Sequence, residues 1–370
     1  MVILNVQLNN LLAFENLELN FSYPKKIVDS SISHEHLQDR PNFRYKKLIV
    51  LMGANATGKT ALGRVLMGII NFISRRELQS ITLLIEDKKK EAGFTIDMAL
   101  PDHQLYRIEA FVRPKQTEEY SINDVAVTVR NTYIRTIDSY ETCIKRLLGN
   151  DSQPYNNYIE ALEQVPRLTW LFDYSSSPEG RFRVMRPDNP ELFCKNLKAT
   201  LKTLDPRIQD VTQIPDSENA YAVSYKHATV FITSDEIVPK GVLSSGTMEG
   251  IGIASMITAM KMKSVSFFYC DEKFSHIHSD AEKAFLSLFI DLLNGDTQLF
   301  FTSHNLDILD MNLPKHSFAF LKRDEDNNIS CSFASDYLKK NSDSVKNAME
   351  NDLFSASPDV EKIYSLLEVK

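Results

Sequence analysis

The sequence predicts an α/β protein in which helices flank a mixed sheet and an α+β lobe is inserted into the chain. Three observations support this fold class. A short apolar stretch at 46–52 leads through a glycine-containing loop into an apolar stripe with helical spacing that begins at Lys59. A strand, an amphipathic helix and another strand follow one another over 265–303, as in a parallel crossover unit. Between 114 and 235 the pattern changes to separate helices and a hairpin.

The elements before residue 114 follow from apolar spacing. Alternation with a period of two predicts strands joined by a turn at 2–8 and 17–21, and the polar segment 22–46 is expected to be a loop. After the helix from Lys59 we expect three successive strands, at 80–86, 93–100 and 105–112.

The rest of the chain is assigned in the same way. We expect helices at 133–148, 155–165, 190–204 and 247–262, a hairpin at 220–233, and strands at 265–270 and 298–303. Ser279-x-x-Glu282 has the form of a capping box and predicts the start of the helix between those two strands. The apolar stretches at 318–322 and 329–333 flank an acidic turn and predict a final hairpin.

Composition excludes several classes of protein. The net charge of −7 argues against a generic nucleic-acid coat, and the four scattered cysteines favour a reducing compartment over a disulfide framework or a zinc site. The N-terminus lacks the basic start of a signal peptide, and no apolar run is long enough to span a membrane. We therefore expect a cytoplasmic protein. Most of the 12 glycines fall in two windows, 53–68 and 241–252, where the backbone is expected to approach a ligand closely.

The first window holds the strongest motif. Residues 53–60 match G-x-x-x-x-G-K-[ST] between a predicted strand and a predicted helix, the context that phosphate binding requires. Backbone N–H groups and the helix N-terminus would surround the phosphates, Lys59 would face the β- and γ-phosphates, and the Thr60 hydroxyl would bind Mg²⁺. The expected nucleotide contacts are Gly53, Ala54, Asn55, Ala56, Thr57, Gly58, Lys59, Thr60 and Ala61.

A pair of acids ends the apolar strand at 265–270. Strands of α/β sheets present such residues at their carboxyl ends, where ligands bind. We expect Asp271 to bind Mg²⁺ and Glu272 to act as the general base on the attacking water. The alternative, a surface turn with two solvated acids, loses weight because the chain also has the phosphate-binding motif.

Two further segments can be interpreted from their positions relative to these motifs. The segment Leu243–Glu249 would alone be a helix cap, but between the phosphate-binding motif and Asp271 it resembles the signature motif of ABC-type ATPases. That resemblance implies that Ser244 and the N–H of Gly246 contact the γ-phosphate bound by a second copy. His304, after the strand at 298–303, resembles the switch histidine of the same superfamily, although a helix cap with a bystander histidine is the alternative. The H-x-H of His276 and His278 corresponds to the D-loop, which we favour over a metal site.

The order of these motifs resembles the ATPase head of ABC and SMC proteins. The N-terminal segment 3–21 is similar to the opening of RecF-like heads, and segments 335–343 and 351–354 resemble the ends of OLD-like and AbiL-type bacterial defence ATPases. The resemblance implies head halves at 1–113 and 243–370, an inserted lobe at 114–242, and ATP with Mg²⁺ as ligands. The nuclease domain of OLD proteins is expected to be absent, so the effector would be a separate protein.

Three functions remain open at this point. The first is an ATP-dependent homodimer, or higher homo-oligomer, that acts as a switch for a co-encoded effector in phage defence. The second is a RecF-like DNA-repair ATPase, for which the basic residues are Arg181, Arg183, Arg186, Lys195, Lys198, Lys202 and Arg207. The third, a transporter subunit, is disfavoured by the inserted lobe. The Q-loop glutamine is not assigned; Gln104 and Gln116 are the candidates.

Overall fold

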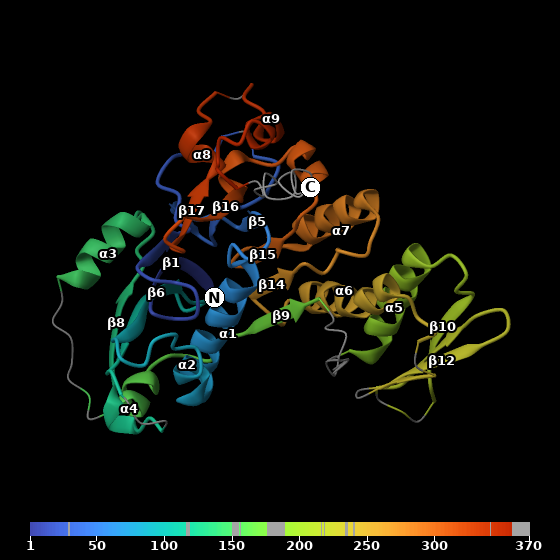
Figure 1. Ribbon diagram of the computed structural model, residues 1–370, viewed down its shortest axis with the longest axis horizontal. Coiled ribbons are helices and arrows are strands. Elements are labelled where there is room, and N and C mark those ends of the chain that lie inside the picture. Colours follow the sequence, from blue (N-terminus) through green and yellow to red (C-terminus); the bar gives the residue numbers. More distant parts are fainter. Residues whose placement is uncertain are drawn as a thin grey trace, which may run out of the picture. The chain divides into compact units, whose positions relative to one another are not determined.

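The computed structural model describes residues 1–356 apart from 29, 116–118, 150–154, 156, 176–188, 216, 218, 234–235, 240 and 341. The chain forms two compact units, which are described one at a time (Figure 1). The Gly53 unit consists of Val2–Leu168 and the chain from Leu306 onward, and the Asp271 unit consists of Met1 and Thr169–Asn305. From the sequence, the boundaries of an inserted lobe are expected at 113/114 and 242/243. These boundaries stay a prediction.

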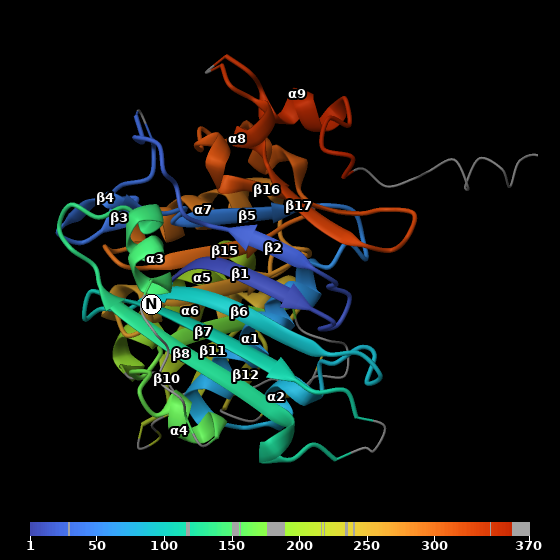
Figure 2. The ribbon, with the colours of Figure 1, turned by 90° about the vertical axis from the view of Figure 1, so that its left-hand side faces the viewer.

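An antiparallel sheet forms one side of the Gly53 unit, with the strand order β2-β1-β6-β7-β8 (Figure 2). Its strands are β1 (Val2–Asn9), β2 (Leu17–Asn20), β6 (Ala92–Ala99), β7 (Gln104–Val112) and β8 (Val125–Tyr133). Helix α1 (Lys59–Arg75) buries its predicted apolar stripe, and the ring of Phe72 meets that of Phe94 on β6 edge-on at 6.1 Å. Helix α3 (Tyr140–Leu148) is tied to the sheet by the Tyr140 hydroxyl, which donates to Asp97 at 2.6 Å.

A second group of strands in this unit positions the glycine-containing loop. Strand β5 (Leu48–Met52) is fully buried and pairs in parallel with β16 (Phe318–Arg323), which pairs in antiparallel with β17 (Ile329–Phe333). The final hairpin and the strand before the loop are thus confirmed. The remaining elements are β3 (His36–Leu37), β4 (Arg40–Arg44), α2 (Gln79–Thr82), α4 (Tyr158–Leu162), α8 (Ala334–Tyr337), α9 (Val345–Glu350) and three 3₁₀ turns at Ile122–Asp124, Leu306–Asp310 and Lys315–Ser317.

The Asp271 unit is built on three parallel strands. Strand β14 (Phe267–Asp271) lies between β9 (Trp170–Tyr174) and β15 (Gln298–Thr302), and α7 (Ser279–Leu292) makes the crossover from β14 to β15. The expected parallel crossover unit is therefore present. Because parallel strands end at the same edge, the residues that follow β14 and β15 are neighbours.

Two helices and a small sheet complete this unit. Helices α5 (Pro190–Leu204) and α6 (Ser245–Met262) lie side by side (Figure 1), and a Cβ added at Gly250 would come within 2.7 Å of Leu204. Both helices share a buried apolar cluster with the antiparallel strands β10 (Asp210–Gln213), β11 (Tyr221–Ser224), β12 (Thr229–Ile232) and β13 (Ile237–Val238). The hairpin expected at 220–233 is β11 with β12.

Several local expectations differ from the structure, among them the loop expected at 22–46, which contains the strands β3 and β4. Segment 80–86 is not a strand, because residues 79–82 form α2 and the Thr82 hydroxyl donates to the Leu78 carbonyl. The helix expected from 133 begins at Tyr140, since β8 extends to Tyr133, and neither β8 nor β9 was expected. Helix α7 is capped by His278, whose ring accepts the N–H of Asp280, rather than by Ser279.

Among the helices of the described residues, none combines the length and the apolar character that crossing a lipid bilayer requires.

Candidate functional site

The loop between β5 and α1 has the tight backbone that the motif predicts. Gly53, Ala56 and Gly58 have φ values of +148°, +63° and +102°, where side chains are rarely tolerated. A Cβ on Gly53 would lie 2.5 Å from the Leu321 carbonyl oxygen, and one on Gly58 would lie 2.8 Å from Ile329 Cδ1. The loop is therefore a curled backbone that a Cβ at either glycine would disrupt, and this curl suits a phosphate group.

Charge and helix geometry at this loop also fit a phosphate. The Lys59 side chain is buried and its Nζ donates to the carbonyls of Gly53 and Ala54, at 2.9 and 3.2 Å. Gly58 provides no side-chain cap for α1, so the start of this helix presents backbone N–H groups. Thr60, a half-buried residue, lies in the first turn of α1. The loop thus has the groups needed to hold the phosphates of a nucleotide.

The Asp271 unit brings three of the predicted residues together. The Thr302 hydroxyl donates to Asp271 Oδ1 at 2.9 Å and accepts the backbone N–H of Glu272 at 2.8 Å. Glu272, with φ +49°, turns its side chain to His304, and Oε1 and Nε2 are hydrogen-bonded at 2.7 Å. Both of these side chains reach solvent, with 28% and 41% of their surface exposed. A cavity of about 320 Å³ opens beside them.

Glu282 is a residue of this site that the sequence assigned to a helix cap. It is buried, and its carboxylate accepts hydrogen bonds from the Ser303 hydroxyl at 2.7 Å and from the Asn305 amide at 2.8 Å. These two residues flank His304, so Glu282 fixes the segment that carries the histidine. In the sequence, Glu282 stands out only as the acid of the capping box that begins at Ser279, so its role in this site was not predicted.

The predicted signature segment forms the start of α6. The Ser244 hydroxyl caps this helix by accepting the Thr247 N–H at 3.2 Å. A Cβ on Gly246 would lie 2.7 Å from the His276 carbonyl oxygen, so the helix start lies directly against the segment that follows Glu272. The capping role is thus present, and the role of Ser244 and Gly246 in a second copy's site stays a prediction.

Charged side chains lie near the contact between Gly246 and His276. Lys273 forms an ion pair with Asp173 at 2.8 Å, and Glu249 of α6 accepts a hydrogen bond from the His276 backbone N–H. Burial raises the pKa of Glu249 to about 7, against the lowering influence of His276 and Lys273. Burial also raises the pKa of Asp173, although Lys273 opposes it. A Cβ on Gly252 would lie 2.1 Å from Asp173 Oδ2, so α6 approaches this carboxylate closely.

We expect Glu249→Gln to make the protein more stable at alkaline pH. The pKa of Glu249 is raised above the 4.5 of an unfolded chain, so the wild type loses stability as pH rises from about 4.5 to 7, whereas the amide does not titrate. The gain in unfolding free energy should be near zero at pH 4 and on the order of 3 kcal/mol at pH 8. Denaturant unfolding at both pH values measures it, with the exposed Glu236→Gln as control. A gain that does not depend on pH would show that Glu249 is charged throughout.

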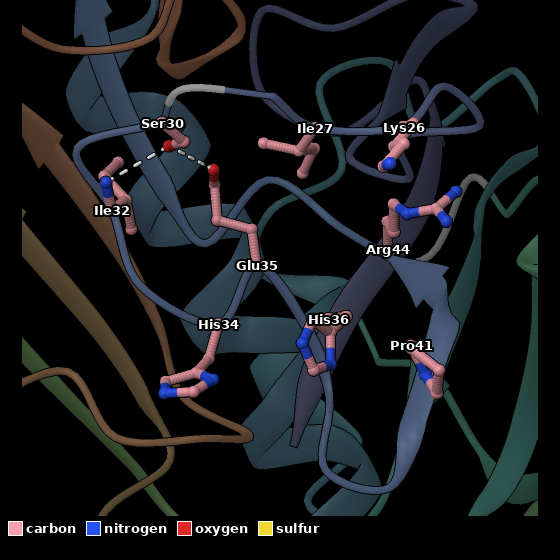
Figure 3. Close-up of a pocket in the computed structure, with 9 residues that line it drawn as sticks. All are labelled: Lys26, Ile27, Ser30, Ile32, His34, Glu35, His36, Pro41 and Arg44. Carbon is pink, nitrogen blue, oxygen red and sulfur yellow. Dashed lines mark hydrogen bonds between the residues drawn. The ribbon is translucent and has the colours of Figure 1, made fainter.

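A larger cavity, of about 450 Å³, lies in the Gly53 unit (Figure 3). Its lining contains none of the residues predicted for the nucleotide site. Glu35 accepts a hydrogen bond from the Ser30 hydroxyl at 2.6 Å and contacts His316 Nε2 at 2.6 Å, and Lys26 and Arg44 also line the cavity.

The residues that favoured DNA binding are partly neutralised. Lys198 pairs with Asp210 at 2.5 Å and Arg207 pairs with Asp205 at 2.8 Å. Arg181, Arg183, Arg186 and Gln116 lie outside the described residues, whereas Lys195 is exposed, the Lys202 ammonium donates to the Gln209 carbonyl, and Gln104 begins β7. Among the described residues, no group of three or more His, Cys, Asp or Glu side chains could hold a metal ion, and His278 caps α7.

A curled glycine-containing loop that runs into a helix, and parallel strands that end in Asp-Glu and a histidine segment, define a P-loop NTPase fold of the ABC/SMC head class. Residues 48–310 match the family described as "AAA domain, putative AbiEii toxin, Type IV TA system", and the chain belongs to this family. No curated protein matches the sequence.

One solved structure with a TM-score above 0.5 shares the fold. The chain is similar to an SMC head bound to the C-winged helix domain of ScpA, with a TM-score of 0.53 and 13% identity, over 90% of this chain and 98% of that one. It also matches the SMC head domain of Thermotoga maritima, with a TM-score of 0.42 and 12% identity, over 90% and 99%. A Pyrococcus furiosus SMC head with an extended coiled coil, bound to the C-terminal domain of ScpA, matches with a TM-score of 0.43 and 12% identity, over 96% and 100%.

Proposed function

We propose that this protein binds ATP with Mg²⁺ and hydrolyses it. The observation that carries the proposal is the hydrogen-bonded arrangement of Asp271, Thr302, Glu272 and His304. Nucleotide binding alone would not require a carboxylate such as that of Glu272, whose backbone is held by Thr302 and whose side chain is held by His304. Its combination with the Gly53–Thr60 loop in one chain supports ATP hydrolysis.

Each residue has a role that its geometry suits. Lys59 would leave the Gly53 and Ala54 carbonyls for the β- and γ-phosphates, which are stronger acceptors. Thr60 and Asp271 would hold Mg²⁺, which neutralises charge on the phosphates. Glu272 would accept a proton from the attacking water, and His304 would orient Glu272 and contact the γ-phosphate. Thr302 keeps the backbone of Glu272 and the carboxylate of Asp271 in fixed relation.

Phosphate release tests this directly. The purified chain should release inorganic phosphate from ATP in the presence of Mg²⁺, and EDTA should stop the release. Excess Mg²⁺ should restore it. Absence of release by a folded protein that binds ATP would leave a nucleotide-binding protein without ATPase activity.

We further propose that ATP joins two copies, with Ser244 and Gly246 of one copy completing the site of the other. The start of α6 offers N–H groups of the kind that bind anions, and Ser244 lies at its cap. The structural relatives of this fold are SMC heads, which supports the arrangement only at the level of fold.

Mixing two inactive variants should recover activity if the sites are shared. Lys59→Ala removes the phosphate-binding charge, and Ser244→Arg blocks the start of α6. In the mixed dimer one site has both intact halves and the other has both altered halves, so part of the ATPase rate should return. A mixture that forms heterodimers but stays inactive would indicate either sites within one copy or coupled firing. A covalently linked dimer with one altered site distinguishes these two explanations. About half of the wild-type activity would indicate sites within one copy, and no activity would indicate coupled firing.

We propose that the protein acts in the cytoplasm as an AbiL-type defence ATPase, in which the nucleotide state controls a separate, co-encoded effector. Membership of the AbiEii-type family and four free cysteines support this role and compartment. Co-purification with the product of a neighbouring gene tests it. Salt-dependent binding to DNA would instead favour a RecF-like function, for which the ion pairs of Lys198 and Arg207 leave less free charge.

A further inference from the structure

Strand β16 continues beside the phosphate-binding loop after its partner strand has ended. The last residue pair between β5 and β16 is Met52 with Phe320, and β16 extends to Arg323. Residues 321–323 therefore run along the loop, as the close approach of the Leu321 carbonyl to Gly53 shows. At the end of this strand the Arg323 Nε donates to the carbonyl oxygen of Ala56 at 3.1 Å.

Ala56 is the residue of the loop that most needs such a contact. Of the three residues with positive φ, two are glycines, and Ala56 alone carries a Cβ in the left-handed region at φ +63°. An L-residue enters this region at a cost in free energy that glycine does not have. Strained backbone of this kind persists where its surroundings determine it, and the arginine supplies a charge-assisted hydrogen bond at that residue.

We propose that Arg323 is a positioning residue of the phosphate-binding loop. Its guanidinium holds the Ala56 carbonyl and so keeps the left-handed turn that directs the loop's N–H groups toward nucleotide phosphates. The proposal rests on the proposed function, because nucleotide binding is the property that the turn serves. It assigns to the final hairpin, far from the motif in sequence, a part in nucleotide affinity.

Lys322 provides the matched control. It precedes Arg323 on the same strand and carries the same charge, and strand alternation directs its side chain to the opposite face. The acidic residues Asp324, Glu325 and Asp326 follow both. Removal of either charge changes the general electrostatics of the hairpin alike, but only Arg323→Ala removes the contact with Ala56.

Calorimetric titration with a non-hydrolysable ATP analogue and Mg²⁺ tests the proposal. Arg323→Ala should weaken binding about fivefold, the equivalent of one hydrogen bond, and Lys322→Ala should leave it unchanged. In steady-state kinetics Arg323→Ala should raise KM by a similar factor and leave kcat unchanged, because the residue acts on binding alone. Arg323 is exposed, so the variant should keep the melting temperature of the wild type.

The decisive comparison uses a second background. Glycine occupies the left-handed region without assistance, so in an Ala56→Gly chain the loss caused by Arg323→Ala should fall below about twofold. An equal loss in both backgrounds would mean that Arg323 contacts the nucleotide itself, and an equal loss in Lys322→Ala would mean that charge alone matters; either result overturns the proposal, as does unchanged binding by Arg323→Ala. If the wild type fails to bind the analogue, the proposed function fails first and this proposal fails with it.

Discussion

Glu272→Gln is expected to bind ATP as the wild type does and to lose hydrolysis by a factor on the order of a hundred to ten thousand. The amide keeps the size of the side chain and a hydrogen bond to His304, but it is a far poorer proton acceptor. Asp271 and Thr302 remain in place, so the proposed Mg²⁺ ligand is unaffected. The trapped ATP state should raise the mass measured by light scattering to that of a dimer.

Two comparisons make this result specific. Asp280→Asn changes an acid of the same unit that is largely exposed, and it should hydrolyse ATP at the wild-type rate. Titration with ATP must show unchanged affinity in Glu272→Gln before its rate is interpreted. If the variant turns over as fast as the wild type, the base is another residue and the contact of Glu272 with His304 serves only to position the histidine.

Lys59→Ala is expected to abolish measurable nucleotide binding, a loss on the order of a hundredfold or more. The ammonium is the one basic group within the Gly53–Thr60 loop, and the triphosphate brings several negative charges to it. Calorimetry with ATP and Mg²⁺ measures the loss. Arg64→Ala, which removes an exposed charge from the next turn of α1, should bind ATP normally.

A folded Lys59→Ala protein with wild-type affinity would contradict the assignment of the loop. Since the lysine also contacts the Gly53 and Ala54 carbonyls, its loss can alter the loop. Lys59→Met keeps the length and apolar stem of the side chain and separates the two effects. Equal loss in both variants identifies the charge as the cause.

The motifs could be predicted from sequence because their geometry is local. The glycines and Lys59 act within eight residues, and a strand that ends in Asp271 and Glu272 presents both at its carboxyl end whatever else the fold contains. The strands β1, β5, β14 and β15 and the helices α1, α5, α6 and α7 carry strong apolar patterns and are confirmed. The roles of the site residues stay predictions.

What could not be predicted depends on partners distant in sequence. Strand β9 shows no alternation in burial and is defined by pairing with β14, almost a hundred residues later. Glu282 resembled a capping residue because its partners Ser303 and Asn305 belong to the next strand–loop segment. The pKa of Glu249 depends on burial against residues that follow Glu272, which no spacing within α6 reveals.

The three glycines of α6 have a mechanical consequence. At Gly246, Gly250 and Gly252 the helix has no side chain of its own, and added Cβ atoms would lie 2.7, 2.7 and 2.1 Å from the His276 carbonyl oxygen, the Leu204 side chain and the Asp173 carboxylate. At these three positions α6 therefore has no side chain of its own that could absorb a small displacement by changing its rotamer. We therefore expect a shift of the start of α6 to be transmitted to α5 and to the β10–β13 sheet, which share a buried apolar cluster with it. If nucleotide binding shifts the start of α6, we expect this sheet to move relative to α7, and distance measurements between labels on β12 and α7 would detect the movement.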